Sequence, residues 1–209
     1  MIFRSFAVPP LDCNCSIIGD PITKQALVVD PGGDSARILK ELQECGLTIA
    51  YIVHTHAHFD HFLASGEMKQ ATGAPLLLHK ADKMLWDNLE MQCQVFGVSY
   101  APAPPPDRWL KDDEELTLGE VTGLALHTPG HTPGSMCFHF PAVHMVIAGD
   151  TLFRGSIGRT DLWGGDEKAI ERSIKDRLYT LDEGTRVITG HGPETRIGDE
   201  LRFNLYVRL

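Results

Sequence analysis

Residues 50–61 read AYIVHTHAHFDH, a short apolar run that ends in four histidines and an aspartate. The run AYIV has the composition of a buried β-strand, and the loops that follow such strands carry most active sites of α/β proteins. Neutral imidazoles contribute little to a surface loop, whereas they bind divalent metals well. The stretch therefore predicts a metal site at the end of a strand.

Three further segments repeat this arrangement of an apolar strand, a glycine and a potential ligand. They are TPGHTPGS with His131, MVIAGDTLF with Asp150 and RVITGHGPE with His191. Glycines beside a ligand residue let the backbone approach closely and adopt positive φ, so each loop can turn a side chain into a shared cavity. We therefore expect the four segments to form one site.

Proline and glycine divide the first half of the chain into short elements. Strands are predicted at 2–8, 13–20, 25–30, 48–55 and 76–79, and helices at 35–45 and 81–96. Asp34 is the expected N-cap of the first helix, and Gly46 is its expected end. The second helix carries an apolar stripe at helical spacing, formed by Leu85, Leu89, Cys93 and Phe96.

The second half begins after a proline-rich stretch at 101–106, which is too short for a domain linker and predicts a surface loop. Beyond it, strands are predicted at 115–118, 121–128, 134–140, 143–149 and 185–190, and a helix at 166–181. Two blocks of strands with helices after each predict an α/β protein, a four-layer αβ/βα sandwich. A chain of 209 residues with 43% apolar content is expected to form one domain over residues 1–209.

Composition excludes several classes of partner. The formal charge of −9 and the lack of a Lys/Arg block give no reason to expect nucleic acid or an anionic membrane as a partner. The N-terminal residues do not resemble a signal peptide, and no apolar segment reaches the ~18 residues of a membrane span, so a cytoplasmic location is expected. The five cysteines are expected to be reduced thiols. Cys13 and Cys15 could form a metal pair, but without a partner C-x-x-C they are interpreted as buried core thiols.

The ligand series as a whole is H-x-H-x-D-H followed by a distant His, Asp and His, and it resembles that of the metallo-β-lactamase superfamily. The D-H pair sets the register of the motif on His56, His58, Asp60 and His61. The segments PGHTPGS, GDTLF and GRTDL resemble in particular the small glyoxalase II-like proteins that lack a C-terminal helical domain.

This resemblance implies a binuclear centre with two divalent metals per chain, zinc being the first expectation and iron or manganese fitting the same ligands. His56, His58 and His131 would hold the first metal, and Asp60, His61 and His191 the second, with Asp150 bridging the two. Such a pair can share a water and lower its pKa towards ~7, which makes a hydroxide nucleophile available at neutral pH. Asp60, which would hold the second metal, is the predicted catalytic residue.

The remaining histidines are interpreted as structural. His54 lies in the histidine-rich loop but outside the motif's register, so we expect it to support the ligands rather than bind a metal. The others, in or beside strand segments, are His79, His127, His139 and His144.

Arg159 in the GRTDL segment is the candidate substrate-binding residue. The resemblance implies a basic residue at this place that meets the carboxylates of glutathione, and arginine can do so with two parallel hydrogen bonds. A surface salt bridge to Asp161 or Asp166 is the alternative, and Arg154 is a weaker candidate for the same role. Asp161 stands where the related enzymes have a tyrosine.

The function predicted from these features is hydrolysis of a small thioester, with S-lactoylglutathione as the best single substrate. The alternatives are a persulfide dioxygenase with one iron held by His56, His131 and Asp150, a lactone or β-lactam hydrolase, and a metal-dependent binding or regulatory protein. The sequence does not define the oligomeric state.

Overall fold

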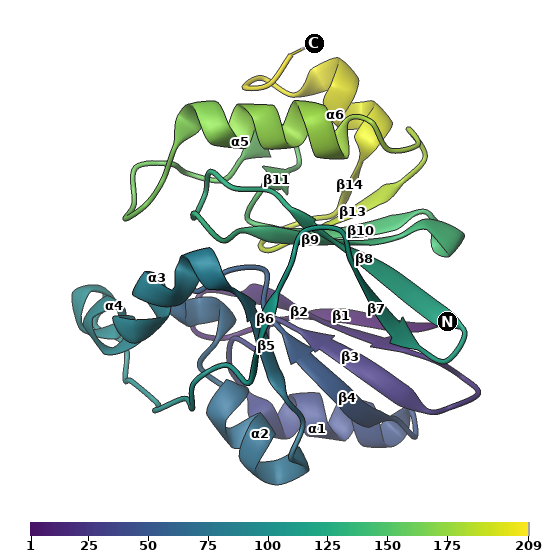
Figure 1. The fold of residues 1–209 in the computed structure, drawn as a ribbon, viewed down its shortest axis with the longest axis vertical. Helices are drawn as coiled ribbons and strands as arrows, with labels where there is room; N and C mark the ends of the chain where they lie inside the picture. The colour runs from purple at the N-terminus through teal and green to yellow at the C-terminus, as the bar shows by residue number, and fades with distance from the viewer. Residues whose placement is uncertain (209) are drawn as a thin grey trace.

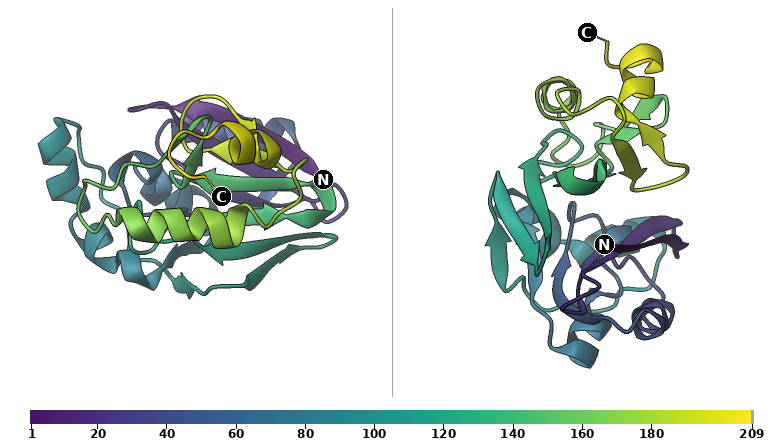
Figure 2. Two further views of the ribbon diagram at one scale, coloured as in Figure 1. Left: turned by 90° about the horizontal axis from the view of Figure 1, so that it is seen from above. Right: turned by 90° about the vertical axis from the view of Figure 1, so that its right-hand side faces the viewer.

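The computed structural model describes residues 1–208 and contains two six-stranded β-sheets packed face to face (Figure 1). Helices α1 (Ser35–Glu44) and α2 (Ser65–Thr72) cover the outer face of one sheet, and α5 (Glu167–Ser173) and α6 (Ile197–Phe203) cover the outer face of the other. The right-hand view of Figure 2 shows the same order of layers. The predicted four-layer αβ/βα sandwich is confirmed.

The first sheet has the order β1-β2-β3-β4-β5-β6. Its strands are β1 (Ile2–Val8), β2 (Cys13–Gly19), β3 (Gln25–Val29), β4 (Thr48–Val53), β5 (Leu76–His79) and β6 (Arg108–Leu110). Strands β3 to β6 are parallel, and α1 and α2 provide the first two crossovers between them. The carboxyl ends of β3, β4 and β5 therefore lie at one edge of the sheet.

The second sheet has the order β14-β13-β10-β9-β8-β7. Its strands are β7 (Glu114–Leu118), β8 (Val121–His127), β9 (Met136–Phe140), β10 (Met145–Gly149), β13 (Arg186–Thr189) and β14 (Thr195–Arg196). Among the described residues of this sheet, β10 and β13 form the only parallel pair of strands. Its crossover contains the hairpin of β11 (Leu152–Phe153) and β12 (Ser156–Ile157), then α5 and a π-helical turn at Ile174–Leu178.

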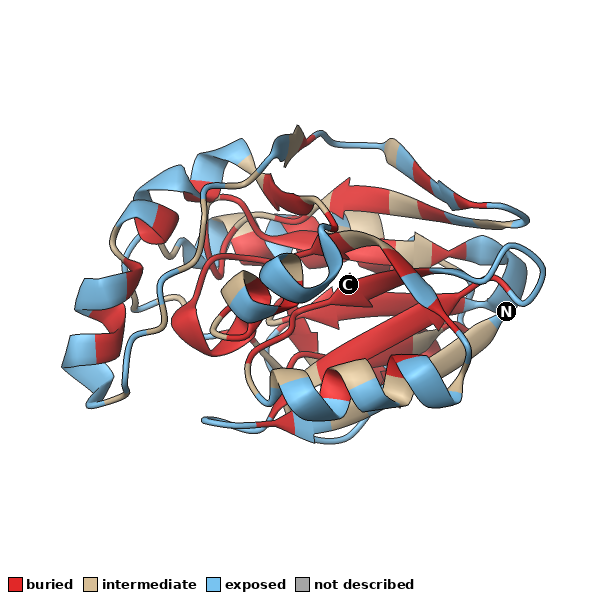
Figure 3. Ribbon diagram, turned by 90° about the horizontal axis from the view of Figure 1, so that it is seen from below, coloured by how far each residue is buried: buried red, intermediate tan, exposed pale blue. Residues whose placement is uncertain are grey.

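Three apolar layers fill the sandwich, which is why many strands read as continuous apolar runs rather than alternating ones. Leu27 and Val29 of β3 face the space between the sheets, where they join Phe138 of β9. Val28 faces the other way and packs in a layer with Ile38 of α1. A third layer lies between the second sheet and its helices. Figure 3 shows this buried interior, with exposed residues confined mainly to outer faces and loops.

Helix α1 follows the sequence prediction closely. The Asp34 carboxylate accepts a hydrogen bond from the backbone N–H of Arg37 at 3.1 Å, as expected of an N-cap. Gly46 adopts φ of 64° directly after the helix, a conformation that glycine takes without strain.

The single helix predicted at 81–96 is wrong. The segment forms a 3₁₀ turn, then α3 (Lys83–Asp87) and α4 (Leu89–Phe96), with a break at Asn88. The Asn88 amide donates to the backbone oxygen of Met84 at 2.8 Å, and this local bond competes with helix continuation. The predicted stripe is buried at Leu85, Leu89 and Cys93, whereas Phe96 is 47% exposed.

Several short elements were not predicted, namely α2, β6, β11, β12, β14 and α6. Most have few residues and little periodicity, so the sequence signal is weak. No helix in the described residues combines the length and the apolar character that a membrane crossing requires.

Candidate metal centre

The predicted ligand residues come together at one edge of the sandwich, each in a loop after the carboxyl end of a strand. The histidine-rich loop follows β4, His131 follows β8, Asp150 follows β10 and His191 follows β13. The two sheets contribute to the site from opposite sides because their strand ends meet at this edge. Convergence of the four segments, expected from the sequence, is therefore what the structure contains.

The first group of donors, which we call the deep group, consists of His56, His58 and His131. The Nδ1 atom of His58 lies 3.1 Å from Nε2 of His56 and 2.9 Å from Nε2 of His131. All three residues are at least 91% buried, since none exposes more than 9% of its surface. Three ring nitrogens aimed at one point suit a single metal ion.

The second group, the outer group, consists of Asp60, His61 and His191. The Nε2 atom of His191 lies 3.2 Å from Nε2 of His61 and 3.2 Å from an oxygen of Asp60. The side chain of His191 is 27% exposed, whereas that of His61 is fully buried. This group therefore borders solvent, which the deep group hardly does.

Asp150 lies between the two groups. One carboxylate oxygen is 3.5 Å from Nε2 of His61, and the other is 3.5 Å from Nε2 of His131. The Oδ1 atom is buried and has no hydrogen-bond partner in residues 1–208. An unpaired buried carboxylate oxygen is unfavourable unless a cation meets it, so the donor set fits divalent metals.

Hydrogen bonds on the far side of each ring fix its orientation. His131 donates from Nδ1 to the backbone oxygen of Arg159 at 2.8 Å, and His191 donates from Nδ1 to that of Leu11 at 3.0 Å. The Nδ1 atom of His61 lies 3.0 Å from the Asp30 carboxylate. A ring that donates from Nδ1 presents the lone pair of Nε2 to the site, as metal-binding histidines do.

The two donor groups differ in charge. Burial and the neighbouring histidines lower the pKa of His56 well below its usual range, and burial together with His131 lowers the pKa of His58 to about 3. Both rings are therefore neutral at pH 7 and available as metal ligands.

The outer group has the opposite electrostatics. Burial alone would lower the pKa of His61, but the surrounding Cys13 and acidic groups, Asp60 among them, raise it well above the usual range. Burial likewise opposes ionisation of Asp60, yet His61 and His191 hold its pKa far below the ordinary value. The outer group therefore stabilises positive charge, which is what a cation site requires.

Two buried carboxylates that the sequence did not single out organise the loops. Asp30, after β3, accepts from the backbone N–H and the hydroxyl of Thr55 at 2.7 and 2.6 Å. Asp82 accepts from the N–H of Ala57 at 3.0 Å and from the hydroxyl of Thr132 at 2.8 Å, and so joins the loops of His58 and His131. Both follow parallel strands of the first sheet, which is the signal that could have identified them.

His54 has a structural role, as expected. Its ring nitrogens lie 3.0 Å from the backbone oxygen of Leu77 and 2.8 Å from the Ser65 hydroxyl. The ring also stacks on Phe62 with centroids 3.7 Å apart. Burial lowers the pKa of His54 to about 4, so the ring is neutral at pH 7.

Cys13 and Cys15 are free and fully buried, as predicted. The Cys13 sulfur lies 3.4 Å from Nδ1 of His61 and so contacts a predicted ligand from behind. Burial raises the pKa of Cys13 to about 12, so the thiol is protonated at neutral pH.

Glycines permit the close approach of strand ends around Asp150. Gly149 adopts φ of 48°, and a Cβ there would lie 2.5 Å from the Thr55 hydroxyl. A Cβ at Gly190 would collide with the Asp150 carboxylate. Gly149 is therefore required by both space and backbone conformation, and Gly190 by space.

A cavity of about 140 Å³ opens over the donors. Apart from the donors, its lining consists of Leu11, Phe59, Gln92, Phe96, Arg159 and Leu162. Arg159 lies at the mouth, where Nε and Nη2 each donate to Asp161 at 2.7 Å. The surface salt bridge considered for Arg159 is thus formed, and the residue also borders the site.

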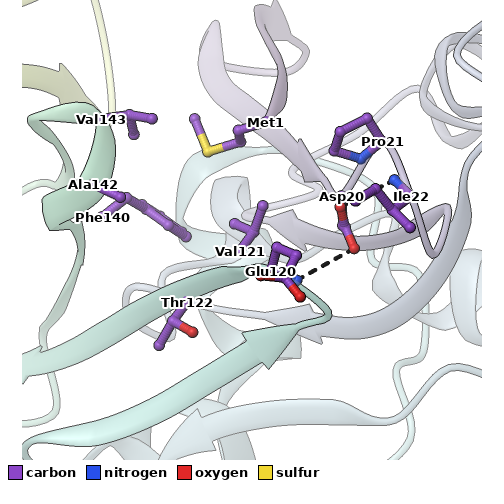
Figure 4. Close-up of a pocket in the computed structure, with 10 residues that line it drawn as sticks. All are labelled: Met1, Asp20, Pro21, Ile22, Glu120, Val121, Thr122, Phe140, Ala142 and Val143. Carbon is purple, nitrogen blue, oxygen red and sulfur yellow. Dashed lines mark hydrogen bonds between the residues drawn. The ribbon is translucent and has the colours of Figure 1, made fainter.

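A second cavity lies away from the donors and is lined largely by apolar groups such as Ile22, Phe140 and Val143 (Figure 4). The Asp20 carboxylate at its edge accepts backbone N–H groups from Ile22 and Glu120 at 3.1 and 3.4 Å. Since this acid is already hydrogen-bonded, the edge with the donor groups remains the candidate centre for catalysis.

Two helix-covered sheets with histidine and carboxylate donors at their shared edge form a site that could hold metal ions. The sequence model of the metallo-beta-lactamase superfamily matches residues 8–191. The chain belongs to this superfamily.

Individual relatives cover nearly the whole chain. The hydroxyacylglutathione hydrolase GloC of Haemophilus influenzae is 38% identical over 93% of this chain and 92% of its own. The crystal structure of BLEG-1 B3 metallo-beta-lactamase has a TM-score of 0.91 at 35% identity, with 99% of each chain covered. The structure of TTHA1623 in a di-iron-bound form has a TM-score of 0.90 at 36% identity, covering 98% of this chain and 100% of that one.

Proposed function

We propose that the protein is a binuclear metal-dependent hydrolase of small thioesters, with S-lactoylglutathione as the first substrate to test. The observation that carries the proposal is the position of Asp150, whose two oxygens face the two donor groups. A carboxylate in this position can bridge two cations. When bound, the two metals supply an activated water and a positive charge for the carbonyl oxygen.

The chain's own groups divide the remaining work. The rings of the deep group are neutral and fixed in orientation, so they direct their nitrogen lone pairs to one point. Asp60 adds a negative charge that favours a cation in the outer group. Asp30 and Asp82 accept hydrogen bonds from the histidine-rich loop and so hold it in position. Positioning of this kind stabilises a transition state without reorganisation during the reaction.

The lining of the cavity supports a thioester as the bond that is cleaved. Outside the donors, the described lining residues include no carboxylic acid, histidine or lysine that could protonate a leaving group. A thiol has an ordinary pKa of about 8.5, so it can leave as the thiolate without a general acid, whereas an amine cannot.

The nature of the relatives supports glutathione as the carrier of the acyl group. A relative at 38% identity is named a hydroxyacylglutathione hydrolase. Arg159 at the mouth of the cavity is the group that we propose for a glutathione carboxylate, since Asp161 occupies only Nε and Nη2 and leaves Nη1 for another acceptor.

The native metals are proposed to be zinc, with iron as the second choice because a similar structure is described in a di-iron-bound form. Histidine and carboxylate donors suit both metals and manganese as well. The proposed substrate is a small molecule, and we propose no nucleic acid or membrane partner.

Hydrolysis by metal-loaded protein tests the proposal. The chain is loaded with Zn²⁺, Fe²⁺ or Mn²⁺, and thiol release from S-lactoylglutathione is followed alongside a β-lactam and oxygen consumption with glutathione persulfide. We expect thioester hydrolysis that His131→Ala abolishes and His144→Ala, a histidine remote from the donors, leaves unchanged. Absence of thiol release with all three metals, or oxygen consumption in its place, would contradict the assignment.

A further inference from the structure

The mouth of the cavity has two chemically different sides. Arg159 and Leu162 line one side, next to the deep group, because the backbone oxygen of Arg159 accepts the hydrogen bond from His131. Leu11 lies on the other side, next to the outer group, because its backbone oxygen accepts the hydrogen bond from His191. The substrate therefore meets different surfaces at its two ends.

The side with Leu11 is apolar, and Phe59 and Phe96 belong to it. The 3₁₀ turn Phe59–His61 contacts α4, which carries Phe96, and also β2, which begins two residues after Leu11. Phe59, in the 3₁₀ turn Phe59–His61, is buried, and its ring lies against that of Phe96 with centroids 5.0 Å apart. Leu11 and Phe96 are 48% and 47% exposed. Single exposed apolar residues are ordinary, but Leu11 and Phe96 come from separate parts of the chain and, together with the buried Phe59, line one cavity beside the donors, which is typical of ligand binding.

The polar group on this side is not available to a ligand. Gln92 is 2% exposed, and its amide nitrogen donates to the backbone oxygens of Ala57 and Leu85 at 3.1 and 2.8 Å. Its oxygen accepts from the N–H of Phe59 at 3.3 Å. Gln92 therefore positions the Phe59 turn, and the surface offered to a ligand is formed mainly by Leu11 and Phe96, with the Phe59 ring packed against Phe96.

We propose that Leu11, Phe59 and Phe96 form the acyl-group pocket and select apolar acyl groups over the polar lactoyl group. The inference rests on the proposed thioesterase function. The carbonyl carbon of a thioester carries the acyl chain on one side and the sulfur of the carrier on the other. If the carbonyl lies over the donors and a carboxylate of the carrier meets Arg159, the acyl chain points towards Leu11 and Phe96. Burial of an apolar chain there removes apolar surface of both partners from water.

The experiment uses one carrier and varies only the acyl group. S-lactoyl-, S-isobutyryl- and S-hexanoylglutathione are compared by kcat/KM, each divided by its rate of spontaneous alkaline hydrolysis. Isobutyryl replaces the lactoyl hydroxyl by a methyl of similar size. We expect hexanoyl to exceed lactoyl by roughly tenfold or more, since each methylene in an apolar pocket can change kcat/KM by ~10-fold or more.

Variants of α4 identify the pocket. Phe96→Ala should bring the hexanoyl-to-lactoyl ratio close to one, and Phe96→Leu should restore part of it. Val95→Ala is the matched control, because Val95 is 63% exposed on the same helix and does not line the cavity.

The outcomes separate the two claims. If no glutathione thioester is hydrolysed, the proposed function falls and the acyl pocket with it. If all three are hydrolysed with equal corrected kcat/KM, or if Phe96→Ala lowers all three by the same factor, the acyl pocket is wrong and the hydrolase proposal stands.

Discussion

The deep and outer donor groups lie side by side, yet they are built on different physical principles. His56, His58 and His131 are buried neutral rings, whereas the outer group contains the anionic Asp60 and borders solvent at His191. In our proposal the deep group would bind a cation through fixed geometry, and the outer group would bind one through charge. Removal of one charge should therefore affect the outer group while the deep group persists.

Asp150 belongs to both groups, so its loss should have the largest effect. In Asp150→Asn the amide removes the bridging charge, and we expect kcat to fall by roughly a thousandfold, since such electrostatic contributions amount to several kcal/mol. Bound metal should also drop below that of the wild type. Activity within tenfold of the wild type would remove the basis for treating the two groups as one centre.

Asp60→Asn separates the groups. The variant should keep the metal of the deep group and lose that of the outer group, with kcat lowered roughly a hundredfold for a loss of about 3 kcal/mol. Elemental analysis and steady-state kinetics on the same preparation measure both effects. A kcat near that of the wild type would show that the outer group does not take part in turnover.

Arg159→Ala lies outside both groups and should spare the chemistry. Because its contact is remote from the carbonyl, KM should rise while kcat changes little, and kcat/KM for S-lactoylglutathione should fall roughly ten- to a hundredfold for one charge-assisted hydrogen bond. The loss should vanish for a thioester without glutathione carboxylates. Equal losses on both substrates would make Arg159 a structural residue that acts through Asp161.

The smallest effect concerns His54, the buried histidine at the start of the histidine-rich loop. His54 has a pKa of about 4 in the fold against 6.5 for an unperturbed ring. The unfolded chain binds this proton more tightly, so stability is complete above pH 6.5 and declines as the pH falls from 6.5 towards 4. The contribution lost is about 3 kcal/mol.

Urea unfolding of metal-free protein from pH 7 to pH 4 measures this contribution. Other buried histidines also titrate, so the comparison is with His54→Asn, whose stability should decline less over the same range. Identical pH profiles for the two proteins would contradict the assignment of His54.

The sequence predicted the donor residues because each of them is marked by its immediate neighbours in the chain. Each ligand follows an apolar strand and a glycine or a histidine-rich motif, so the pattern was visible within a few residues. Asp30 and Asp82 also follow apolar strands, but the residues around them do not reveal their role, since their partners, Thr55, Ala57 and Thr132, come from other loops. Their role depends on the parallel order of β3, β4 and β5, which only the folded sheet defines.

Phe96 illustrates the opposite failure. Helical spacing placed it in a core stripe, but the break at Asn88 changes the course of the helix, and Phe96 emerges at the cavity instead. Apolar periodicity cannot distinguish a residue that packs in the core from one that lines a cavity. The sequence also could not decide between the two roles considered for Arg159, a surface salt bridge and a place in the site. In the structure the residue pairs with Asp161 and also lines the cavity.

Metal stoichiometry tests the central claim, a binuclear centre, most directly. Wild-type protein and His191→Ala are purified under metal-replete conditions and examined by elemental analysis together with thioester turnover. We predict two metals per chain for the wild type, and one for His191→Ala with most of the turnover lost. A wild type that stays at one metal, with His191→Ala fully active, would contradict the binuclear centre and favour the single-iron dioxygenase.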